Sequence, residues 1–545
     1  MAAGAGLLLT AAFPKIGIAG FAWIAPALII AAAQGQHGGD AFRVGYVAGL
    51  VHCLTSLYWL LLMPAGGFPV LAWLPLGAYL ALYPAVWTCI VSRFTFHASD
   101  SWLHRTLWSL GGAAVWVALE LVRARLLGGF PWNLIGVSQF KMVPLVQIAS
   151  VTGVYGISFL VVWTSLSLYT AVHVTFRRPD ARLIWQAEII LPLVAVVALF
   201  VFGFMRLSGE NPASSILRVT LVQPSIPQTL IWNPAEDDRR FQELLVQSQA
   251  ALTNQTDLLL WPESAVPETD LATCRVISQF AQSNHVWLIL NGEDAEYLPD
   301  ATNYFNAAYL VGPDGRWLQV YHKRKLVIFG EYVPLERWLP FVKYLTPITG
   351  GWTPGAKAVQ FEINRWGERP REPEDLGVRR HAGALESGDT SPHSMDSLSG
   401  ASPHQKIKTS PLICFEDVFP GLARDAADGD TDFLVNLTND GWFQQSAEQW
   451  QHMANAVFRA VENGLPLVRC ANNGVTCWID ASGRVREILK DKSGSVYGVD
   501  AMTVEIPVGE PRAPTFYHRR GDWFGWSCVI LAAALAIQRI FARRK

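Results

Sequence analysis

The stretch Ser410-Pro-Leu-Ile-Cys-Phe-Glu-Asp417 sets the character of the soluble part of this chain. A short apolar run, typical of a buried strand, ends abruptly at a thiol that is followed by two carboxylates. A cysteine at the end of a buried strand, beside polar groups, is placed to act as a nucleophile. The alternative is an inert core cysteine. Cys470 and Cys477, which lie inside strands without such neighbours, fit that alternative better.

The composition of the 545 residues indicates a membrane protein. Hydrophobic residues make up 51% and charged residues 16% of the chain, and the mean hydropathy is +0.23. These values are unlike those of an all-soluble protein. Apolar residues crowd into residues 4–208 and 523–541, whereas residues 217–519 have an ordinary globular mixture. We therefore expect a membrane protein with one soluble insert.

The charge and the cysteines exclude several other classes of protein. A net charge of −2 gives no basic excess for nucleic acid, so we expect no nucleic-acid partner. The seven cysteines are an odd number, without a CxxC pair and without histidines at zinc spacing. Neither a disulfide framework nor a metal site is therefore expected.

The apolar segments predict about eight membrane-spanning helices. A hydrocarbon core of about 30 Å requires about 20 apolar residues in a helix. The first segment is short and is expected to form half of a bent hairpin with the second. The candidate segments are residues 3–13, 16–33, 44–63, 70–91, 107–127, 151–174, 184–205 and 523–541.

The distribution of basic residues predicts the orientation. With eight spans, seven precede the soluble insert, which then lies opposite both termini. Cytoplasmic termini place about twice as many basic residues on the cytoplasmic side as on the other, in agreement with the positive-inside rule. No basic region precedes the first apolar run, so a retained segment is expected rather than a cleaved signal peptide. The residues on the cytoplasmic side would be Arg43, Arg93, Arg105, Arg177, Arg178, Arg182, Arg539, Arg543, Arg544 and Lys545, against Lys15, Arg123, Arg125, Lys141 and Arg206 opposite.

The soluble insert alternates strand and helix patterns, which predicts sheets covered by helices. Two hairpins are expected, with turns at Gly312-Pro-Asp-Gly315 and Asp480-Ala-Ser-Gly483. Residues 366–406 have almost no apolar periodicity and are expected to be a disordered insertion. Helices are predicted from residue 234, at 267–283 and at 447–462. Strands are predicted at 217–223, 257–261, 286–291, 306–311, 317–321, 412–414, 433–437, 467–471 and 476–479.

A nucleophilic thiol needs a base or a positively charged neighbour, and the insert offers both. Glu263 follows a buried strand and a proline, which holds its carboxylate at the sheet edge where open α/β sheets carry their chemistry. Lys323 follows another strand and supplies a cation that can lower the pKa of the thiol and stabilise an oxyanion. The alternatives are a helix-capping acid for Glu263 and one charge of a solvated basic face for Lys323.

Glu263, Lys323 and Cys414, in this order and each at a strand end, resemble the Glu-Lys-Cys triad of the nitrilase superfamily. The α-β-β-α sandwich of that superfamily fits the predicted order of elements. The resemblance implies an α/β fold of this kind, inserted into a polytopic α-helical membrane domain. The expected boundaries are 1–208 for the N-terminal membrane domain, 215–510 for the catalytic domain, and 521–545 for a C-terminal helix with a cytoplasmic basic tail.

Further motifs resemble the apolipoprotein N-acyltransferases of bacterial inner membranes. They cover nearly the whole chain, together with the expected seven spans before the insert and one after it. The chain departs from the family at Phe415, where tyrosine is frequent, and at Ile328, where proline is usual. The motifs are Trp261-Pro-Glu263, Lys323-x-x-Leu-Val-x-Phe-Gly-Glu-Tyr-Val-Pro334, Cys414-Phe-Glu416, Asn436-Leu-Thr-Asn-Asp-Gly-Trp-Phe443 and Phe130-Pro-Trp132.

The resemblance also implies supporting residues. Glu331 resembles a second essential carboxylate that supports the Glu-Lys pair or moves a proton, and Glu416 resembles a further acid beside the nucleophile. A structural ion pair is the alternative role for both. Trp232 and Trp442 resemble aromatic residues of the substrate entrance, with core packing as the alternative. The remaining candidates are Phe415, which could pack beside the substrate, and Asn306 and Asn439, which could position amides around the site.

The activity implied by the resemblance is a two-step acyl transfer. Cys414 would take the sn-1 acyl chain of phosphatidylethanolamine as a thioester and pass it to the α-amino group of a diacylglyceryl-cysteine at an apolipoprotein N-terminus. The implied partners are the phospholipid, the diacylated apolipoprotein and the bilayer. No cofactor is expected, because the ester already carries the acyl group. The expected location is the bacterial inner membrane, with a periplasmic catalytic domain and cytoplasmic termini.

Two other functions remain open from the sequence. A membrane-tethered nitrilase-type amidase would resolve the thioester with water and would never become acylated by lipid. A non-catalytic membrane scaffold would retain the sandwich fold without needing Cys414 or Glu263.

Overall fold

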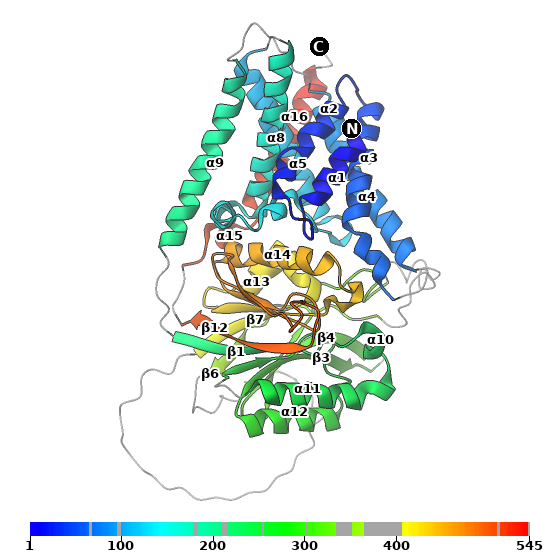
Figure 1. The fold of residues 1–545 in the computed structure, drawn as a ribbon, viewed down its shortest axis with the longest axis vertical. Coiled ribbons are helices and arrows are strands. Elements are labelled where there is room, and N and C mark those ends of the chain that lie inside the picture. The colour runs from blue at the N-terminus through cyan, green and yellow to red at the C-terminus, as the bar shows by residue number, and fades with distance from the viewer. Residues whose placement is uncertain are drawn as a thin grey trace, which may run out of the picture.

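Figure 1 shows a bundle of helices standing on a body of two stacked sheets. The computed structural model describes residues 1–64, 68–94, 100–177, 184–209, 215–252, 256–299, 302–333, 351–364, 406–509 and 513–542. The predicted insertion, up to residue 405, lies outside the described residues. So do five basic residues of the predicted cytoplasmic side, namely Arg178, Arg182, Arg543, Arg544 and Lys545.

The first sheet has six strands in the order β12-β1-β2-β3-β4-β5. Strands β1, β2 and β3 run parallel, and the other neighbours are antiparallel. The predicted hairpin at Gly312–Gly315 is present and joins β4 to β5. The bounds are β1 Ser215–Gln223, β2 Leu258–Leu260, β3 Trp287–Tyr297, β4 Thr302–Val311, β5 Trp317–His322 and β12 Asp500–Val508.

The second sheet also has six strands, in the order β11-β10-β9-β8-β7-β6. Strands β7, β8 and β9 run parallel, which again leaves antiparallel strands at the edges. Each sheet therefore has a parallel centre whose strands end at a common edge. The bounds are β6 Phe361–Asn364, β7 Lys406–Ile413, β8 Phe433–Thr438, β9 Leu467–Ala471, β10 Cys477–Ile479 and β11 Val485–Ile488.

The alternation of side chains along the strands explains the layers. In β2, Leu258 and Leu260 pack between the two sheets, whereas Leu259 packs outward against helices α11 (Asp237–Ala251) and α12 (Leu271–Asn284). In β8, Phe433 points between the sheets, whereas Leu434 belongs to the cluster of the outer helices. Helices α13 (Pro420–Ala426) and α14 (Glu448–Asn463) cover that second outer face. The predicted α-β-β-α order is thus present.

The prediction of the second hairpin was wrong in its turn. Strands β9 and β10 do pair, but residues 472–476 join them, with Gly474 at a φ of +119°. The turn at Asp480–Gly483 instead leads from β10 to β11. Strands β6, β11 and β12 were not predicted. In β12, Pro507 and the interleaved polar residues obscure the apolar pattern that predicts a strand. This strand lies at the edge of the sheet and pairs along one side only, a position where proline is tolerated.

The helical bundle differs from the prediction of eight spans. Among the described residues, three helices are long and apolar enough to cross a membrane, namely Phe68–Val91, Val154–Arg177 and Trp185–Ser208. Helices α1 and α2 have 10 and 8 residues, about 15 Å or less each, so neither reaches across alone. The bounds are α1 Ala2–Ala11, α2 Ala25–Ala32, α3 Gly39–Ser56, α4 Phe68–Val91, α5 Trp102–Arg123, α8 Val154–Arg177, α9 Ile184–Ser208 and α16 Trp523–Ala542.

Helix α14 lies between the second sheet and the bundle (Figure 1). It ends at Gly464, whose φ of +68° suits a residue without a Cβ. Near this end, Glu462 accepts a hydrogen bond from the backbone nitrogen of Val154, at the start of α8, at 3.0 Å. In the bundle, Gln147 donates to the carbonyl oxygen of Ser482 at 2.7 Å. Polar contacts thus join the two parts of the molecule directly.

A buried charge cluster fixes α14 to the second sheet. Nε2 of His452 lies 2.8 Å from Asp417 and Nδ1 lies 2.9 Å from Asp440. Arg469, on β9, pairs with both carboxylates. Burial lowers the pKa of His452, but Asp417 and Asp440 raise it to about 10, so the imidazole carries a charge at neutral pH. Two cations thus balance two carboxylates in a dry interior.

The same cluster includes the three groups best placed to hold a metal ion, Asp440, Glu448 and His452. A charged imidazole has no free lone pair for a metal. Arg469 already pairs with Asp440. Burial, followed by the charge of Asp440, raises the pKa of Glu448 well above its usual value, so this carboxyl stays neutral. The cluster therefore fits a structural ion network and not a divalent cation.

Replacing Arg469 by Met should lower the stability of the protein by about 3–5 kcal/mol, because two buried carboxylates lose their shared cation. The thermal unfolding of the protein in lipid nanodiscs measures this loss. Arg486 is the matched control, because its pair with Asp480 is 2.6 Å long but its side chain is 43% exposed. Arg486→Met should cost less than about 1 kcal/mol. Equal shifts of the two melting temperatures would contradict the role of the buried cluster.

Candidate active site

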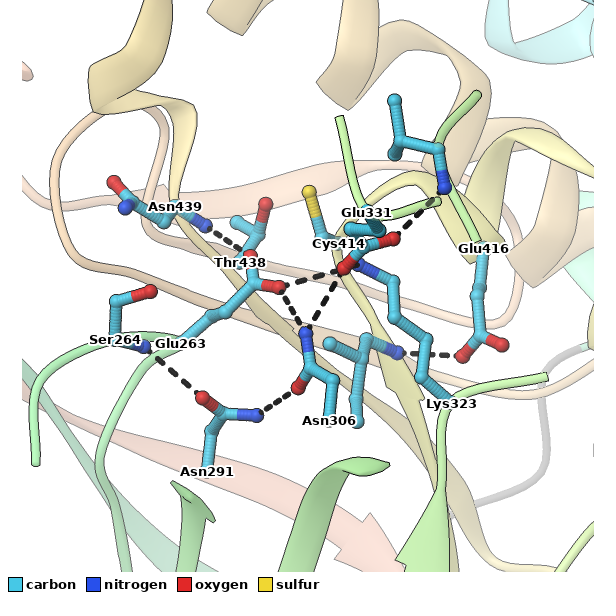
Figure 2. A network of polar contacts seen from close by, with 12 residues as sticks. Glu263, Ser264, Asn291, Asn306, Lys323, Glu331, Cys414, Glu416, Thr438 and Asn439 are labelled. Atoms are coloured by element: carbon cyan, nitrogen blue, oxygen red, sulfur yellow. Dashed lines mark hydrogen bonds and ion pairs between the residues drawn. The ribbon is translucent and has the colours of Figure 1, made fainter. Parts of the chain in front are cut away.

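The candidate residues gather where strands of both sheets end. Glu263 follows β2, Lys323 follows β5 directly, and Cys414 follows β7 directly. Figure 2 shows Glu263, Lys323, Glu331 and Cys414 turned toward one another. The sequence order alone could not place them together, because they come from two different sheets. The sandwich brings their ends to one edge.

The carboxylate of Glu263 is held by three hydrogen bonds. Its Oε1 accepts from Nζ of Lys323 at 3.2 Å and from Nδ2 of Asn306 at 3.0 Å. Its Oε2 accepts from the backbone nitrogen of Asn439 at 3.1 Å. The side chain is buried. These donors fix the direction of a carboxylate that lies beside the thiol in Figure 2.

Lys323 is 1% exposed and lies between two carboxylates. Its ammonium is 3.2 Å from Glu263 and 2.7 Å from Glu331. Burial lowers the pKa of Lys323, but the charges of Glu263 and Glu331 outweigh it and raise the pKa well above the usual value. The lysine is therefore a permanent cation. Its positive charge can also stabilise the thiolate or oxyanion that a reaction at Cys414 would create.

Glu331 is held as firmly as Glu263. Its Oε1 accepts from Lys323 and, at 3.1 Å, from Nδ2 of Asn306, and its Oε2 accepts from the backbone nitrogen of Val327 at 2.8 Å. The predicted pairing with the Glu-Lys pair is thus present in the geometry. Glu331 supplies a second negative charge next to Lys323, so that the lysine stays paired when Glu263 gains a proton.

Cys414 sits at a strained turn at the end of β7. Its φ is +51°, a left-handed conformation that L side chains adopt at a cost of about 1–3 kcal/mol. Its carbonyl oxygen accepts a hydrogen bond from Nδ2 of Asn436 at 2.9 Å. Such strain is common where a side chain must project from a strand end into a site. Cys414 is half-buried, unlike the fully buried Cys470 and Cys477.

The resting thiol is neutral. Burial is the main cause that raises the pKa of Cys414 well above its usual value, and the negative charge of Glu263 raises it further. Lys323 and a hydrogen bond with Thr438 oppose this shift. A neutral thiol is a weak nucleophile, so the site needs a base at the moment of attack. Glu263 is the carboxylate placed for that role.

Asn306 donates hydrogen bonds to the carboxylates of Glu263 and Glu331, and further amide hydrogen bonds set its orientation. Oδ1 of Asn306 accepts from Nδ2 of Asn291 at 2.6 Å. Oδ1 of Asn291 in turn accepts from the backbone nitrogen of Ser264 at 3.0 Å. Sequence reasoning missed Asn291, although an amide in the otherwise apolar run of β3 is a signal that could have revealed it. Thr438 and Asn436, polar residues within β8, carry the same signal.

Glu416 lies behind the site and accepts hydrogen bonds from two segments of the chain. Its Oε1 accepts from the backbone nitrogens of Arg324 and Lys325 at 2.6 and 2.9 Å. Its Oε2 accepts from the hydroxyl of Tyr321 at 2.7 Å and the backbone nitrogen of Ile413 at 2.8 Å. Burial raises its pKa. The carboxyl thus fixes the segment after Lys323 against the strand that carries Cys414.

Asn439 reaches the site through its backbone. Its N–H binds Glu263, whereas its side-chain Nδ2 donates to Oε1 of Gln228 at 2.9 Å, and its Oδ1 accepts from Asn472 at 3.1 Å. Gln228 begins helix α10 (Gln228–Ile231), which ends at Trp232. Trp232 is 61% exposed, so it does not pack in the core. The amides connect the candidate base to the segment that carries this exposed indole.

Aromatic rings of the helical part pack against Phe415, the residue after Cys414. Phe415 contacts the rings of Phe130 and Trp132, each at 6.0 Å, and that of Phe419 at 5.0 Å. Trp442 is half-buried in the short 3-10 helix η8 (Asp440–Phe443), which follows Asn439. Phe130 and Trp132 belong to the helical part of the chain, so the thiol lies where that part meets the second sheet.

Family models match both parts of the chain. Residues 5–167 match the apolipoprotein N-acyltransferase N-terminal domain, and residues 218–498 match the carbon-nitrogen hydrolase model. An apolipoprotein N-acyltransferase from Geobacter metallireducens is 33% identical over 98% of this chain and 94% of its own length. The chain belongs to the apolipoprotein N-acyltransferase family. Its two-sheet domain accordingly has a nitrilase-like fold.

Other members of the apolipoprotein N-acyltransferase family agree over similar lengths. The one from Bradyrhizobium diazoefficiens is 31% identical over 95% of this chain and 89% of its own length. Among solved structures, a carbon-nitrogen hydrolase from Helicobacter pylori aligns with 15% identity over 57% of this chain and 94% of that chain, at a TM-score of 0.34. Family membership and the apolar helices make this protein a membrane protein.

Replacing Glu263 by Gln should have opposite effects on two reactions of Cys414. The loss of the negative charge lowers the pKa of the thiol, so alkylation by iodoacetamide should accelerate and its pH profile should move to lower pH. Enzymatic turnover should nevertheless fall by about 10²–10⁴, because the base is gone. Rates of alkylation at the Cys414 peptide between pH 6 and 10 measure the first effect.

Glu268→Gln is the matched control, because this exposed carboxylate lies five residues further along the chain. It should change neither the alkylation profile nor turnover. A profile of Glu263→Gln that moves to higher pH would contradict the electrostatic account of the site.

Proposed function

We propose that this protein transfers an acyl chain from a phospholipid to the α-amino group of the N-terminal diacylglyceryl-cysteine of apolipoproteins. The transfer proceeds through a thioester on Cys414. The observation that carries this proposal is the contact of Phe415, next to the thiol, with Phe130 and Trp132 of the helical part. A nucleophile whose neighbour in the chain packs against rings of the membrane part suits an electrophile with a long apolar chain.

The first step is the acylation of the thiol. Glu263 takes the proton of Cys414, and the sulfur attacks the sn-1 ester carbonyl of phosphatidylethanolamine. Lys323 and a backbone N–H near Cys414 stabilise the oxyanion, at about 3 kcal/mol for each donor. The C–O bond then breaks, the proton goes from Glu263 to the leaving glycerol oxygen, and a lysophospholipid departs.

The second step moves the acyl chain to the acceptor. Glu263, ionised again, takes a proton from the neutral α-amine of the diacylated apolipoprotein as the nitrogen attacks the thioester. The C–S bond breaks, an amide forms, and Glu263 returns this proton to the sulfur of Cys414. Neither step needs a cofactor, because the ester supplies an activated acyl group.

The remaining residues have supporting roles in this proposal. Glu331 keeps Lys323 paired while Glu263 is protonated, and Glu416 fixes the segment after Lys323. Asn306 and the backbone of Asn439 aim the base. The residues that contact substrate in this proposal are Trp232, Trp442 and Phe415.

The proposed topology follows from the lipid substrates. The helical parts, residues 1–208 and 521–545, anchor the catalytic domain, residues 215–510, at the outer surface of the bacterial inner membrane. About eight membrane segments, including the short α1 and α2 as a paired element, place both termini in the cytoplasm. The catalytic domain is then periplasmic, where both lipid substrates are exposed.

The test uses the protein in nanodiscs that contain phosphatidylethanolamine labelled in its sn-1 chain, together with a synthetic diacylglyceryl-cysteine peptide. The label should appear as an amide on the peptide, with one lysophospholipid formed for each amide. An otherwise identical peptide with an acetylated α-amino group should receive none. Mass spectrometry of the peptide measures both results.

Cys414→Ser should abolish the transfer, while Cys274→Ser, a change of a half-buried cysteine on α12, should leave it unchanged. Release of the label as free fatty acid in the presence of either peptide would contradict the proposal and favour a hydrolase. Full transfer by Cys414→Ser would leave only a scaffold role for the nitrilase-like domain.

A further inference from the structure

One amide side chain, that of Gln451 on α14, joins the nitrilase-like domain to four points of the helical part. Its Oε1 accepts from the indole nitrogens of Trp59 at 3.1 Å and Trp132 at 2.8 Å. Its Nε2 donates to the carbonyl oxygens of Pro14 at 2.9 Å and Ser56 at 3.2 Å. All four hydrogen-bonding positions of the amide are thus used.

The chemistry of the partners fixes the orientation of this amide. An indole nitrogen only donates, so both tryptophans must face the oxygen of Gln451. A carbonyl oxygen only accepts, so Pro14 and Ser56 must face its nitrogen. The side chain is 2% exposed. Water therefore cannot replace the bonds, and each tryptophan has a single defined position.

Trp132 contacts the residue after Cys414, and Trp59 packs against Trp132. The ring of Trp132 stacks on Phe415 at 6.0 Å with an interplanar angle of 27°, and it lies 5.5 Å from the ring of His452, the next residue on α14. The ring of Trp59 lies 5.3 Å from Trp132 and 4.6 Å from Phe443. Gln451 therefore sets the place of an aromatic wall that continues to Phe415.

We propose that Gln451 is a positioning residue, which holds Trp59 and Trp132 behind Phe415, the ring against which the acyl chain lies when Cys414 is acylated. The inference rests on the proposed function, since it names the residue that shapes the acyl side of the same site. Gln451 contacts neither the thiol of Cys414 nor the charged groups of Glu263, Lys323 and Glu331. It acts through the indoles.

The same bonds could serve only to tie the two parts of the molecule together. Gln147 separates these roles, because it also spans them, with 2.7 Å to the carbonyl oxygen of Ser482, but lies outside the aromatic cluster around Trp132. If Gln451 served only as a tether, Gln147→Met and Gln451→Met would have the same effect on the recognition of long chains. A positioning role predicts that only Gln451→Met changes the recognition of long chains.

The experiment compares the alkylation of Cys414 by N-dodecyl iodoacetamide and by iodoacetamide, in the full-length protein in nanodiscs, read at the Cys414 peptide. The wild type should prefer the dodecyl reagent. Gln451→Met should reduce this preference about tenfold, the factor that corresponds to the loss of about one hydrogen bond at each indole. The rate with iodoacetamide itself should change less than about twofold, because Glu263 and Lys323 are untouched. Gln147→Met should keep the preference.

Trp132→Phe provides a second route to the same test, since it removes the indole N–H without changing Gln451. It should lose the dodecyl preference to a similar extent. In the double variant, the two losses should be less than additive, because the part of the Gln451→Met effect that passes through the indole of Trp132 is already gone. If Gln451→Met does not fold, Trp132→Phe alone must show the loss.

In the acyl-transfer assay, Gln451→Met should raise KM for the phospholipid about tenfold with little change in kcat. A preference in Gln451→Met equal to that of Gln147→Met would overturn the inference, as would additive losses in the double variant. A dodecyl preference that depends on Gln451, in a protein that never takes an acyl chain from phospholipid, would refute the proposed function and leave the positioning role supported.

Discussion

The site depends on one buried cation, the ammonium of Lys323. A lysine that is 1% exposed is tolerated only with charged partners, since an unpaired buried charge costs several kcal/mol. Glu263 and Glu331 provide them at 3.2 and 2.7 Å. Two carboxylates around one cation leave a net negative charge next to Cys414. Burial, together with this charge, keeps the thiol protonated, and one carboxylate remains able to accept its proton.

The sandwich explains why this arrangement needs two sheets. The proposed base comes from the end of β2, the cation from the end of β5 and the proposed nucleophile from the end of β7, which belongs to the other sheet. Glu416 binds the segment after the lysine and the strand before the nucleophile with one carboxyl. On the other side, α14 carries Gln451 and His452 of the buried charge cluster. Through Asp417, this cluster ties the segment that follows Cys414 to the helix that contacts the helical part.

The sequence predicted the parts of this structure that depend on local pattern. The buried runs before Glu263 and Cys414 and the sheets covered by helices were predicted from apolar periodicity and turn residues, and the resemblance to the nitrilase superfamily implied the α-β-β-α order. Strands β6, β11 and β12 were missed, because they are short or mixed with polar residues and gain their place only by pairing. The contacts of Gln451 could not be predicted, because its partners lie about 320 to 440 positions away in the chain. The predicted number of spans stays a prediction, since three of the described helices are long and apolar enough to cross a membrane and short helices such as α1 are not.

The most direct test of the account is the intact mass of the purified wild-type protein after incubation with phosphatidylethanolamine in the absence of an acceptor. The account predicts the mass of one acyl chain, located on Cys414, removable by hydroxylamine as a thioester and lost on addition of a diacylglyceryl-cysteine peptide with a free amine. An unmodified protein, or an acyl chain on any other residue, would contradict the claim that Cys414 is the nucleophile of a lipid acyltransferase.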